Sequence, residues 1–148
     1  MSVERIGLEA LVVGQRFTSG TKVVTADEIK LFASEFDPQP FHLDEDGAAP
    51  TLFAGLAASG WHTAAMTMRL LVDGGLPLAG GIIGTGGELL WLKPVRPGDA
   101  LTVESEILAI TPSRSKPDRA VVEIRCLTEN QHGDTVQSFS PKLVVVRS

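Results

Sequence analysis

The sequence of 148 residues contains a single cysteine, Cys126. An intrachain disulfide or a cysteine-rich metal site is therefore impossible. Cys126 lies in an alternation of apolar and charged residues over positions 121–127, which predicts a buried strand residue rather than a nucleophile. A chain of this length buries roughly two thirds of the surface that its unfolded form exposes, so it needs no covalent staple. We expect one domain over residues 1–148 in a reducing, cytoplasmic compartment.

Basic residues are also few, since 13 Lys and Arg stand against 18 Asp and Glu and give a net charge of −5. They are scattered, so the electrostatic footprint of nucleic-acid binding is missing. The N-terminus lacks the basic region and apolar run of a secretion signal. Residues 47–68 contain no charged side chain, but they are mostly small residues with Pro50 and His62 among them. We therefore predict an interior helix there and no membrane span.

The strongest chemical signal is the segment 37–42 (DPQPFH), which places a carboxylate and an imidazole five positions apart. Its two prolines fix their own φ at about −65° and disfavour helical geometry at the residues before them, so we expect an extended or turning segment. Ionised Asp37 and the imidazole of His42 can together orient one water, remove its proton and return a proton. The alternative is that Asp37 opens a turn and His42 packs at the edge of the core.

Helical patterns flank this segment on both sides. Thr25 and Glu28 match a capping box, and apolar residues then recur at spacings of three and four, which predicts a helix that ends before Asp37. Residues 44–48 predict a short helical turn. A longer helix is predicted over residues 59–72, where small side chains allow close packing on a sheet and the glycines after it supply a left-handed cap.

From residue 84 onward the pattern changes to the alternation typical of strands. Strands are predicted over residues 11–24, 88–93, 101–107, 120–127 and 135–146. The last of these contains Pro141, which must lie at an edge or a bulge. Helices followed by an antiparallel sheet indicate an α+β fold. Such a sheet would bury an uncharged helix on one side only, unless the strands curl around it.

With these elements in place, the chain resembles the MaoC-like dehydratases, which are (R)-specific enoyl-CoA hydratases with the hot-dog fold. The resemblance runs from about residue 15 to 147 and includes the hairpin 93–99 (KPVRPGD). The family signature D-x-N-P-aliphatic-H-x-D appears at residues 37–44 as DPQPFHLD, with Gln39 in place of Asn and Phe41 in place of the aliphatic residue. It implies a curved antiparallel sheet of about five strands wrapped around the 59–72 helix, in a homodimer that continues the sheet.

The resemblance also implies a reaction, the hydration of trans-2-enoyl-CoA to (R)-3-hydroxyacyl-CoA or its reverse. Asp37 and His42 would act on water, and the N–H of Gly60 would stabilise charge on the thioester oxygen. The remaining residues expected at the substrate are Gln39, Ser59, Trp61 and Phe53. Pocket size is expected to depend on Leu52, Phe53, Trp61 and Met66, and the phosphates of coenzyme A on Lys93, Arg96, Arg114 and Lys116. For Ser59 and Gly60 the alternatives are an N-cap and a packing requirement.

Other polar motifs are weaker. The three histidines do not have the spacing of a metal site, and the glycines of residues 80–87 do not form a dinucleotide fingerprint, so no metal or cofactor is expected. These glycines are interpreted as a flexible approach to the second strand. His62 either borders the pocket or is buried against backbone, and His132 is interpreted as a solvated turn residue.

Two rival functions stay open at this stage. A hot-dog thioesterase would use a carboxylate to activate water at C1 of the acyl group instead of C3. A non-catalytic hot-dog subunit would bind acyl thioesters, or only a partner chain, without turnover. The presence of both Asp37 and His42 favours the hydratase, because a non-catalytic subunit would be free to lose either one.

Overall fold

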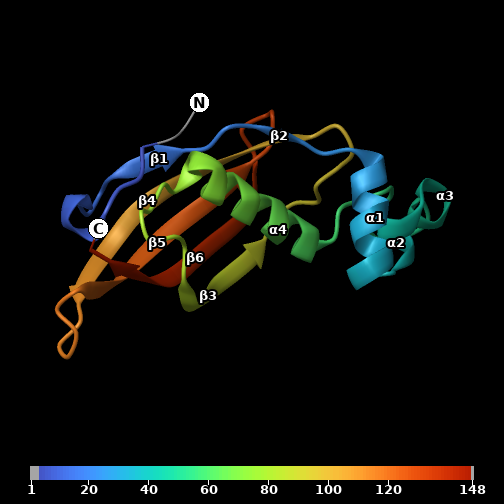
Figure 1. Cartoon of the computed structure of the whole chain (residues 1–148). Coiled ribbons are helices and arrows are strands. Elements are labelled where there is room, and N and C mark those ends of the chain that lie inside the picture. Colours follow the sequence, from blue (N-terminus) through green and yellow to red (C-terminus); the bar gives the residue numbers. More distant parts are fainter. Residues whose placement is uncertain (1–3, 148) are drawn as a thin grey trace.

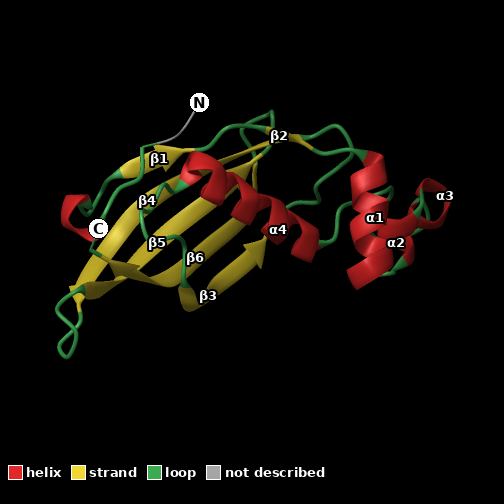
Figure 2. Ribbon diagram, in the orientation of Figure 1, coloured by secondary structure: helices red, strands yellow, loops and turns green. Residues whose placement is uncertain are grey.

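The computed structural model describes residues 4–147. Its strands form one curved antiparallel sheet, and a long helix, α4, lies across one face of that sheet (Figure 1). Three further helices, α1 to α3, lie together beyond one end of the sheet (Figure 2). The α+β arrangement predicted from the sequence, with a sheet curved around a central helix, is confirmed.

Six strands make up the sheet, in the order β1-β4-β5-β6-β3 with β2 also paired to β4. Their bounds are β1 Arg16–Thr18, β2 Lys22–Val23, β3 Gly84–Trp91, β4 Ala100–Pro112, β5 Arg119–Glu129 and β6 Thr135–Val146. The three long strands were predicted, and β4 and β5 extend beyond the predicted ends. The single strand predicted over residues 11–24 is wrong, because the chain turns at Gly14, where φ is 90°, and pairs only in two short pieces.

Gly84, Gly86 and Gly87 belong to β3, so the interpretation of the glycines as a flexible approach is wrong for these three, whereas Gly80 and Gly81 precede the strand. Gly87 lies opposite Pro141 of β6, and a Cβ atom on Gly87 would stand 2.7 Å from the Cα of Pro141. Pro141 is not on an edge strand, since β6 runs between β5 and β3. The ladder between β5 and β6 instead passes from the pair Glu123–Lys142 to the pair Cys126–Phe139, so the proline is accommodated by a local interruption.

The predicted helix before Asp37 is confirmed as α1, Ala26–Phe36, with Thr25 Oγ1 accepting from the Glu28 N–H at 3.2 Å. The expectation that the whole 37–42 segment avoids helix is wrong in its second half. Pro40 begins a single helical turn, α2 (Pro40–Leu43), because proline at the first helical position needs no hydrogen bond and already has helical φ. The predicted turn after it is α3, Glu45–Ala48.

The central helix is α4, Gly60–Leu70, and it continues as a π-helical turn, η2 (Leu71–Gly75), with Gly74 at φ 145°. The predicted left-handed glycine at its end is confirmed. The expectation of burial on nearly every side is wrong within this chain. Thr63, Thr67 and Leu70 are buried, whereas the apolar side chains of Trp61 and Met68 on another side are 61% and 37% exposed.

The core lies between α4 and the inner face of the sheet, as alternation along the strands requires. Buried core side chains from the long strands are Leu101, Val103, Ile107, Val122, Ile124, Cys126, Val136, Leu143 and Val145. Burial raises the pKa of the Cys126 thiol to about 11, against a smaller opposing effect of the Ser105 hydroxyl. Cys126 is therefore the buried strand residue that was predicted, and its raised pKa keeps the thiol protonated at neutral pH.

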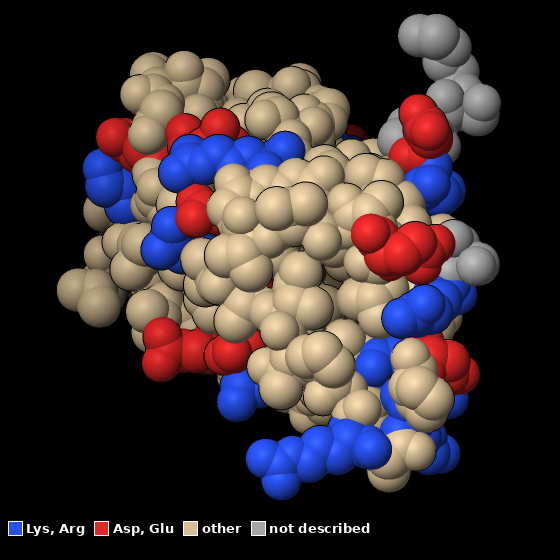
Figure 3. Space-filling model, turned by 90° about the vertical axis from the view of Figure 1, so that its left-hand side faces the viewer, with Lys and Arg blue, Asp and Glu red and all other residues tan. Residues whose placement is uncertain are grey.

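Two surface properties bear on partners. Figure 3 shows the end of the molecule opposite α1 to α3, where residues of both charge signs are interspersed around an uncharged central area. That face therefore does not present the continuous basic surface that nucleic acid attracts. Within residues 4–147, no helix combines the length and the apolar character needed to cross a membrane.

The contact between Gly87 and Pro141 predicts a position-specific cost. Gly87→Ala should lower the free energy of unfolding by about 1–3 kcal/mol, because the added methyl meets backbone atoms that cannot rotate away. Gly84→Ala is the matched control, since its Cβ would lie 3.8 Å from the Leu143 side chain. Urea denaturation of both variants measures the difference, and equal stability of the two would contradict this description of the strand pair.

Candidate active site

The ends of two helices bring Asp37 and His42 together. Asp37 follows the last turn of α1, and its N–H donates to the Ala33 carbonyl at 2.9 Å. His42 lies on the single turn of α2. Its Nε2 atom is 3.4 Å from Oδ2 of Asp37, and the two side chains are only 5% and 18% exposed. A carboxylate and an imidazole therefore face each other at the edge of the core.

The orientation of His42 is fixed by its other ring nitrogen. Nδ1 lies 2.7 Å from the carbonyl oxygen of Ala57, and because a carbonyl can only accept, Nδ1 carries a proton and donates it. In the neutral form of the ring the lone pair is then on Nε2, the atom that faces Asp37. The rings of Phe41 and Phe53 pack around the imidazole, with centroids 4.6 and 5.7 Å away.

Asp37 is held as an anion. Partial burial opposes its ionisation, but hydrogen bonds from the Ser59 hydroxyl and the Gln39 amide, together with the nearby His42, outweigh burial and hold the pKa of the carboxyl below its usual value. The Ser59 Oγ donates to Oδ2 at 2.7 Å, and Gln39 Nε2 donates to Oδ1. At neutral pH the site therefore presents a carboxylate.

Ser59 connects this carboxylate to the start of the central helix. It is fully buried, and its Oγ accepts from the Trp61 N–H at 3.3 Å while donating to Asp37. The N-cap alternative for Ser59 is confirmed, and its bond to Asp37 is an addition that the sequence did not indicate. Within residues 4–147 the Gly60 N–H has no hydrogen-bond acceptor, which leaves a donor at the positive end of the helix dipole.

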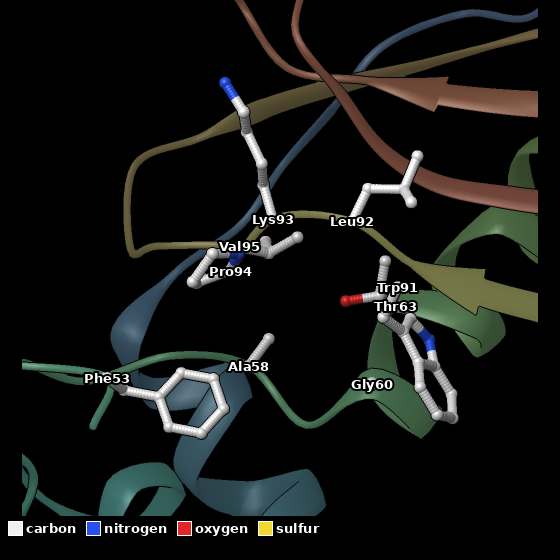
Figure 4. A pocket seen from close by; sticks show the side chains of 9 residues that line it. All are labelled: Phe53, Ala58, Gly60, Thr63, Trp91, Leu92, Lys93, Pro94 and Val95. Carbon is white, nitrogen blue, oxygen red and sulfur yellow. The ribbon is translucent and has the colours of Figure 1, made fainter. Parts of the chain in front are cut away.

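A pocket of about 220 Å³ opens at Gly60. Its lining residues are Phe53, Ala58, Gly60, Thr63, Trp91, Leu92, Lys93, Pro94 and Val95. Figure 4 shows Phe53, Ala58 and Gly60 on one side and the segment 92–95 on the other. Asp37 and His42 do not line it, but Phe53 borders both the pocket and the imidazole. The pocket and the imidazole therefore lie on either side of a shared neighbour, Phe53.

Of the four residues expected to set the pocket size, only Phe53 lines this pocket. Leu52 is completely exposed on its loop, and Met66 points into the core. Trp61 lines a separate apolar pocket of about 210 Å³ beside Met68 and Leu89. Proximity to the site in sequence was a poor guide because successive side chains on a helix or a loop point in different directions.

The pocket residues that the sequence did not indicate are Ala58, Thr63, Trp91, Leu92, Pro94 and Val95. The hairpin motif at 93–99 was the available signal for the segment 92–95. The fold brings it there through the bond from the Ala58 N–H to the carbonyl of Val95, at 2.8 Å. That pairing of residues distant in sequence cannot be derived from either segment alone.

The expected contacts to phosphate are mostly elsewhere. The guanidinium of Arg96 is used internally, donating to the carbonyls of residues 53, 55 and 56 and so holding the loop that carries Phe53. Arg114 and Lys116 belong to the hairpin between β4 and β5, at the opposite end of the sheet from α1 (Figure 1). Lys93 lines the pocket, and its Nζ lies 3.2 Å from Asp134.

The other histidines lie outside this pocket. His62 is buried and stacks on Phe32 with centroids 4.7 Å apart, and its Nδ1 has no partner in the part of the chain described. Burial, with a smaller contribution from Lys22, holds the pKa of His62 below its usual value against the attraction of Glu28. His132 is exposed in a turn, as interpreted. Residues 4–147 contain no group of three His, Cys, Asp or Glu side chains that could hold a metal.

The sequence is similar to known proteins. Residues 10–129 match the family model described as the MaoC like domain. The uncharacterized protein YdeM of Bacillus subtilis (strain 168) is 34% identical over 140 residues, which cover 94% of this chain and 96% of that protein.

Solved structures are also similar. The crystal structure of the MaoC-like dehydratase from Rhodospirillum rubrum is 62% identical, with a TM-score of 0.95 and coverage of 97% of this chain and 98% of that one. The R-hydratase PhaJ1 from Pseudomonas aeruginosa is 30% identical, with a TM-score of 0.79 and coverage of 99% and 89%. These likenesses confirm the fold class and the family resemblance that the sequence indicated.

The bond from Ser59 to Asp37 predicts a pH-dependent contribution to stability. A carboxyl whose pKa is lowered by folding stabilises the protein above its unfolded pKa of about 3.9, and this stabilisation is lost as the pH falls through the folded value. Ser59→Ala should therefore cost about 1–3 kcal/mol at pH 7 and less at pH 3.

Urea denaturation at the two pH values measures this difference. Ser34→Ala is the control, because that exposed hydroxyl donates to the Leu31 carbonyl and to no carboxylate. Its effect should be the same at both pH values. A cost of Ser59→Ala that does not change with pH would show that the hydroxyl does not stabilise the Asp37 anion.

Proposed function

The chain belongs to the family of MaoC-like dehydratases, and from this premise we propose that it interconverts trans-2-enoyl-CoA and (R)-3-hydroxyacyl-CoA by adding or removing water. The observation that carries this proposal is the pair of acceptor atoms, Asp37 Oδ2 and His42 Nε2, held 3.4 Å apart beside the start of a helix. The likeness to the R-hydratase PhaJ1 supports the reaction class.

Two acceptors held this close together attract a molecule that can donate twice. The Nδ1 proton of His42 is directed to the Ala57 carbonyl, so the neutral form of the imidazole has its lone pair on Nε2, beside the carboxylate of Asp37. The Ser59 hydroxyl already donates to Oδ2 of Asp37. A water molecule can donate one hydrogen to the imidazole and one to the carboxylate. Its own lone pair is then free to attack carbon, and the two side chains can take up its proton.

The start of α4 supplies a hydrogen-bond donor for the thioester of the substrate. The thioester oxygen of the substrate would accept from the N–H of Gly60, which has no acceptor within residues 4–147. This N–H lies at a helix N-terminus, where developing negative charge is stabilised. Binding there withdraws electrons from the C2–C3 double bond, so that C3 becomes the electrophile and the charge that develops is enolate-like.

These groups account for every bond and proton in the hydration. The water oxygen forms a bond to C3, the π bond between C2 and C3 breaks, and C2 receives a proton from Asp37 and His42, which gained one from the water. No group leaves in this direction, and dehydration is the same path in reverse. Phe53, Gln39 and Ser59 are proposed to support it, Phe53 at the pocket and the other two by holding Asp37.

We also propose that the protein is a homodimer joined at β3. This strand is an edge of the sheet, and its only pairing within residues 4–147 is with β6. Leu90 and Leu92, on and just after it, are 46% and 54% exposed, and Trp61 and Met68 expose a further apolar area on α4. Exposed apolar side chains near an unpaired strand edge favour pairing with a second copy.

Replacing either member of the pair tests the reaction. Asp37→Asn and His42→Ala should each lower the rate of crotonyl-CoA hydration by about 10²–10⁴-fold, the range for loss of a general acid or base. The measurement is the decrease in ultraviolet absorbance of the enoyl thioester. Asp46→Asn and His132→Ala are matched controls on exposed side chains, and they should keep normal rates. Near-normal activity in either site variant would refute the assignment.

Thiol release measured in the same assays separates the rival reaction. A hydratase consumes the double bond without releasing coenzyme A. Release of free thiol at the rate of substrate loss would instead identify a thioesterase. Binding of acyl-CoA with neither change would identify a non-catalytic binding subunit.

The dimer is tested by sedimentation. The protein should sediment as a dimer, and Met68→Lys should shift it toward monomer, because a charge would be placed in the apolar contact. Val121→Lys is the control, since Val121 is similarly exposed at 37% but lies on β5 in the middle of the sheet. A wild-type protein that sediments as a monomer at micromolar concentration would contradict the shared edge.

A further inference from the structure

Trp91, the last residue of β3, is fixed on three sides. Its indole lies flat against Gly60, where a Cβ atom would stand 2.5 Å from the ring. The ring of Trp61 meets it edge-on, with centroids 5.1 Å apart and an angle of 81°. Its Nε1 donates to Oε1 of Gln137 at 3.1 Å. The indole is nevertheless 45% exposed, and it lines the pocket at Gly60 (Figure 4).

The hydrogen bond to Gln137 belongs to a polar row beneath the central helix. The sheet register places Trp91 opposite Gln137, and Gln137 opposite Thr128, so the three residues lie side by side on β3, β6 and β5. Thr67 of α4 joins the row from above. Its Oγ1 accepts from Gln137 Nε2 at 3.0 Å and lies 2.7 Å from Oγ1 of Thr128.

This row is buried in an otherwise apolar core, with Gln137 and Thr128 fully inaccessible and Thr67 1% exposed. A buried polar network of this kind is favourable only if its members are paired, and a paired one permits few alternative packings. The row therefore fixes the orientation of the indole relative to α4.

The pocket and the polar row both meet the same side of α4. Gly60, Thr63 and Thr67 are separated by three and four residues, so they share a face of the helix. Gly60 and Thr63 line the pocket, and Thr67 holds the row that holds Trp91. The Gly60 N–H and the indole are thus positioned against each other by the same helix.

We propose that Trp91 is a substrate-contacting wall that directs the acyl thioester onto Gly60, with Gln137 and Thr67 as positioning residues that set the angle of the indole. This inference rests on the proposed function for the identity of the ligand. The planar, half-exposed ring lies beside the Gly60 N–H, and it limits the directions from which a thioester oxygen can reach that donor. It also displaces water from one side of the donor, which strengthens the bond that the oxygen receives.

Binding of butyryl-CoA, which has no double bond to hydrate, tests the wall without depending on catalysis. By calorimetry, Trp91→Ala should weaken binding roughly tenfold through loss of the aromatic contact. Trp91→Phe, which keeps a ring but loses the bond to Gln137, should fall between it and the wild type. Leu108→Ala, on the exposed surface of β4, is the control and should bind normally.

Fluorescence gives a second readout on the same ligand. The chain has two tryptophans, so in Trp61→Phe the emission comes from Trp91 alone. Saturating butyryl-CoA should change that emission. Unchanged emission at a concentration where calorimetry shows full occupancy, or an unchanged Kd in folded Trp91→Ala, would overturn the proposal.

The positioning role of Thr67 is tested by substitutions at this residue, which lies outside the pocket. Thr67→Val removes the hydrogen bonds to Gln137 and Thr128. It should therefore raise Kd for butyryl-CoA and KM for crotonyl-CoA roughly threefold, while kcat changes less. Thr67→Ser keeps the hydroxyl and should restore both values. Melting temperatures of the two variants identify any general loss of stability. Wild-type Kd and KM in Thr67→Val would remove the positioning role.

The two proposals fail in different ways. If butyryl-CoA binding depends on Trp91 but crotonyl-CoA is not hydrated, the role of Trp91 in binding is supported and the hydratase is refuted. Crotonyl-CoA hydration with the same KM in the wild type and in Trp91→Ala would support the hydratase and refute the role of Trp91 in substrate binding. Absence of acyl-CoA binding in the wild type would refute both.

Discussion

The candidate site depends on one hydrogen bond, from the buried hydroxyl of Ser59 to the carboxylate of Asp37. It joins the end of α1 to the start of α4 and so sets the carboxylate beside the helix donor at Gly60. It also favours the ionised form of Asp37 against the cost of partial burial. The imidazole of His42 is then brought to the same place by its bond to the Ala57 carbonyl, two residues before Ser59. The bond from Ser59 therefore connects the acid directly to the residue that caps the helix carrying the Gly60 donor.

The parts of the fold that sequence predicted well are those governed by local rules. The cap at Thr25 and the alternation of β5 and β6 depend on residues a few positions apart, and both were found with nearly correct ends. The errors arose where tertiary contact overrides local preference. Gly87 looked like a flexible linker, but it is a strand residue that permits close approach of Pro141. Pro40 was expected to lie in an extended or turning segment, but it starts a helix.

In the candidate site, too, local contacts could be predicted from the sequence and long-range contacts could not. The neighbourhood of Asp37 and His42 followed from a six-residue motif, because two prolines restrict the chain between them. The bond from Ser59 spans 22 residues and the bond from Trp91 to Gln137 spans 46, and no local pattern predicts either. Arg96 shows the limit most clearly, since a basic residue near a pocket suggested phosphate, whereas its guanidinium is used to hold the loop at residues 53–56. Only the folded chain distinguishes these two uses.

The central claim is that Asp37 and His42 act as one unit on a single water molecule. A double-mutant cycle on the rate of crotonyl-CoA hydration tests it most directly, with Asp37→Asn, His42→Ala and the double variant compared under identical conditions. Residues that act as a unit are strongly non-additive. The account predicts that the double variant is about as slow as the slower single variant. A double variant whose loss equals the product of the two single losses would show that the residues act independently and would contradict the account.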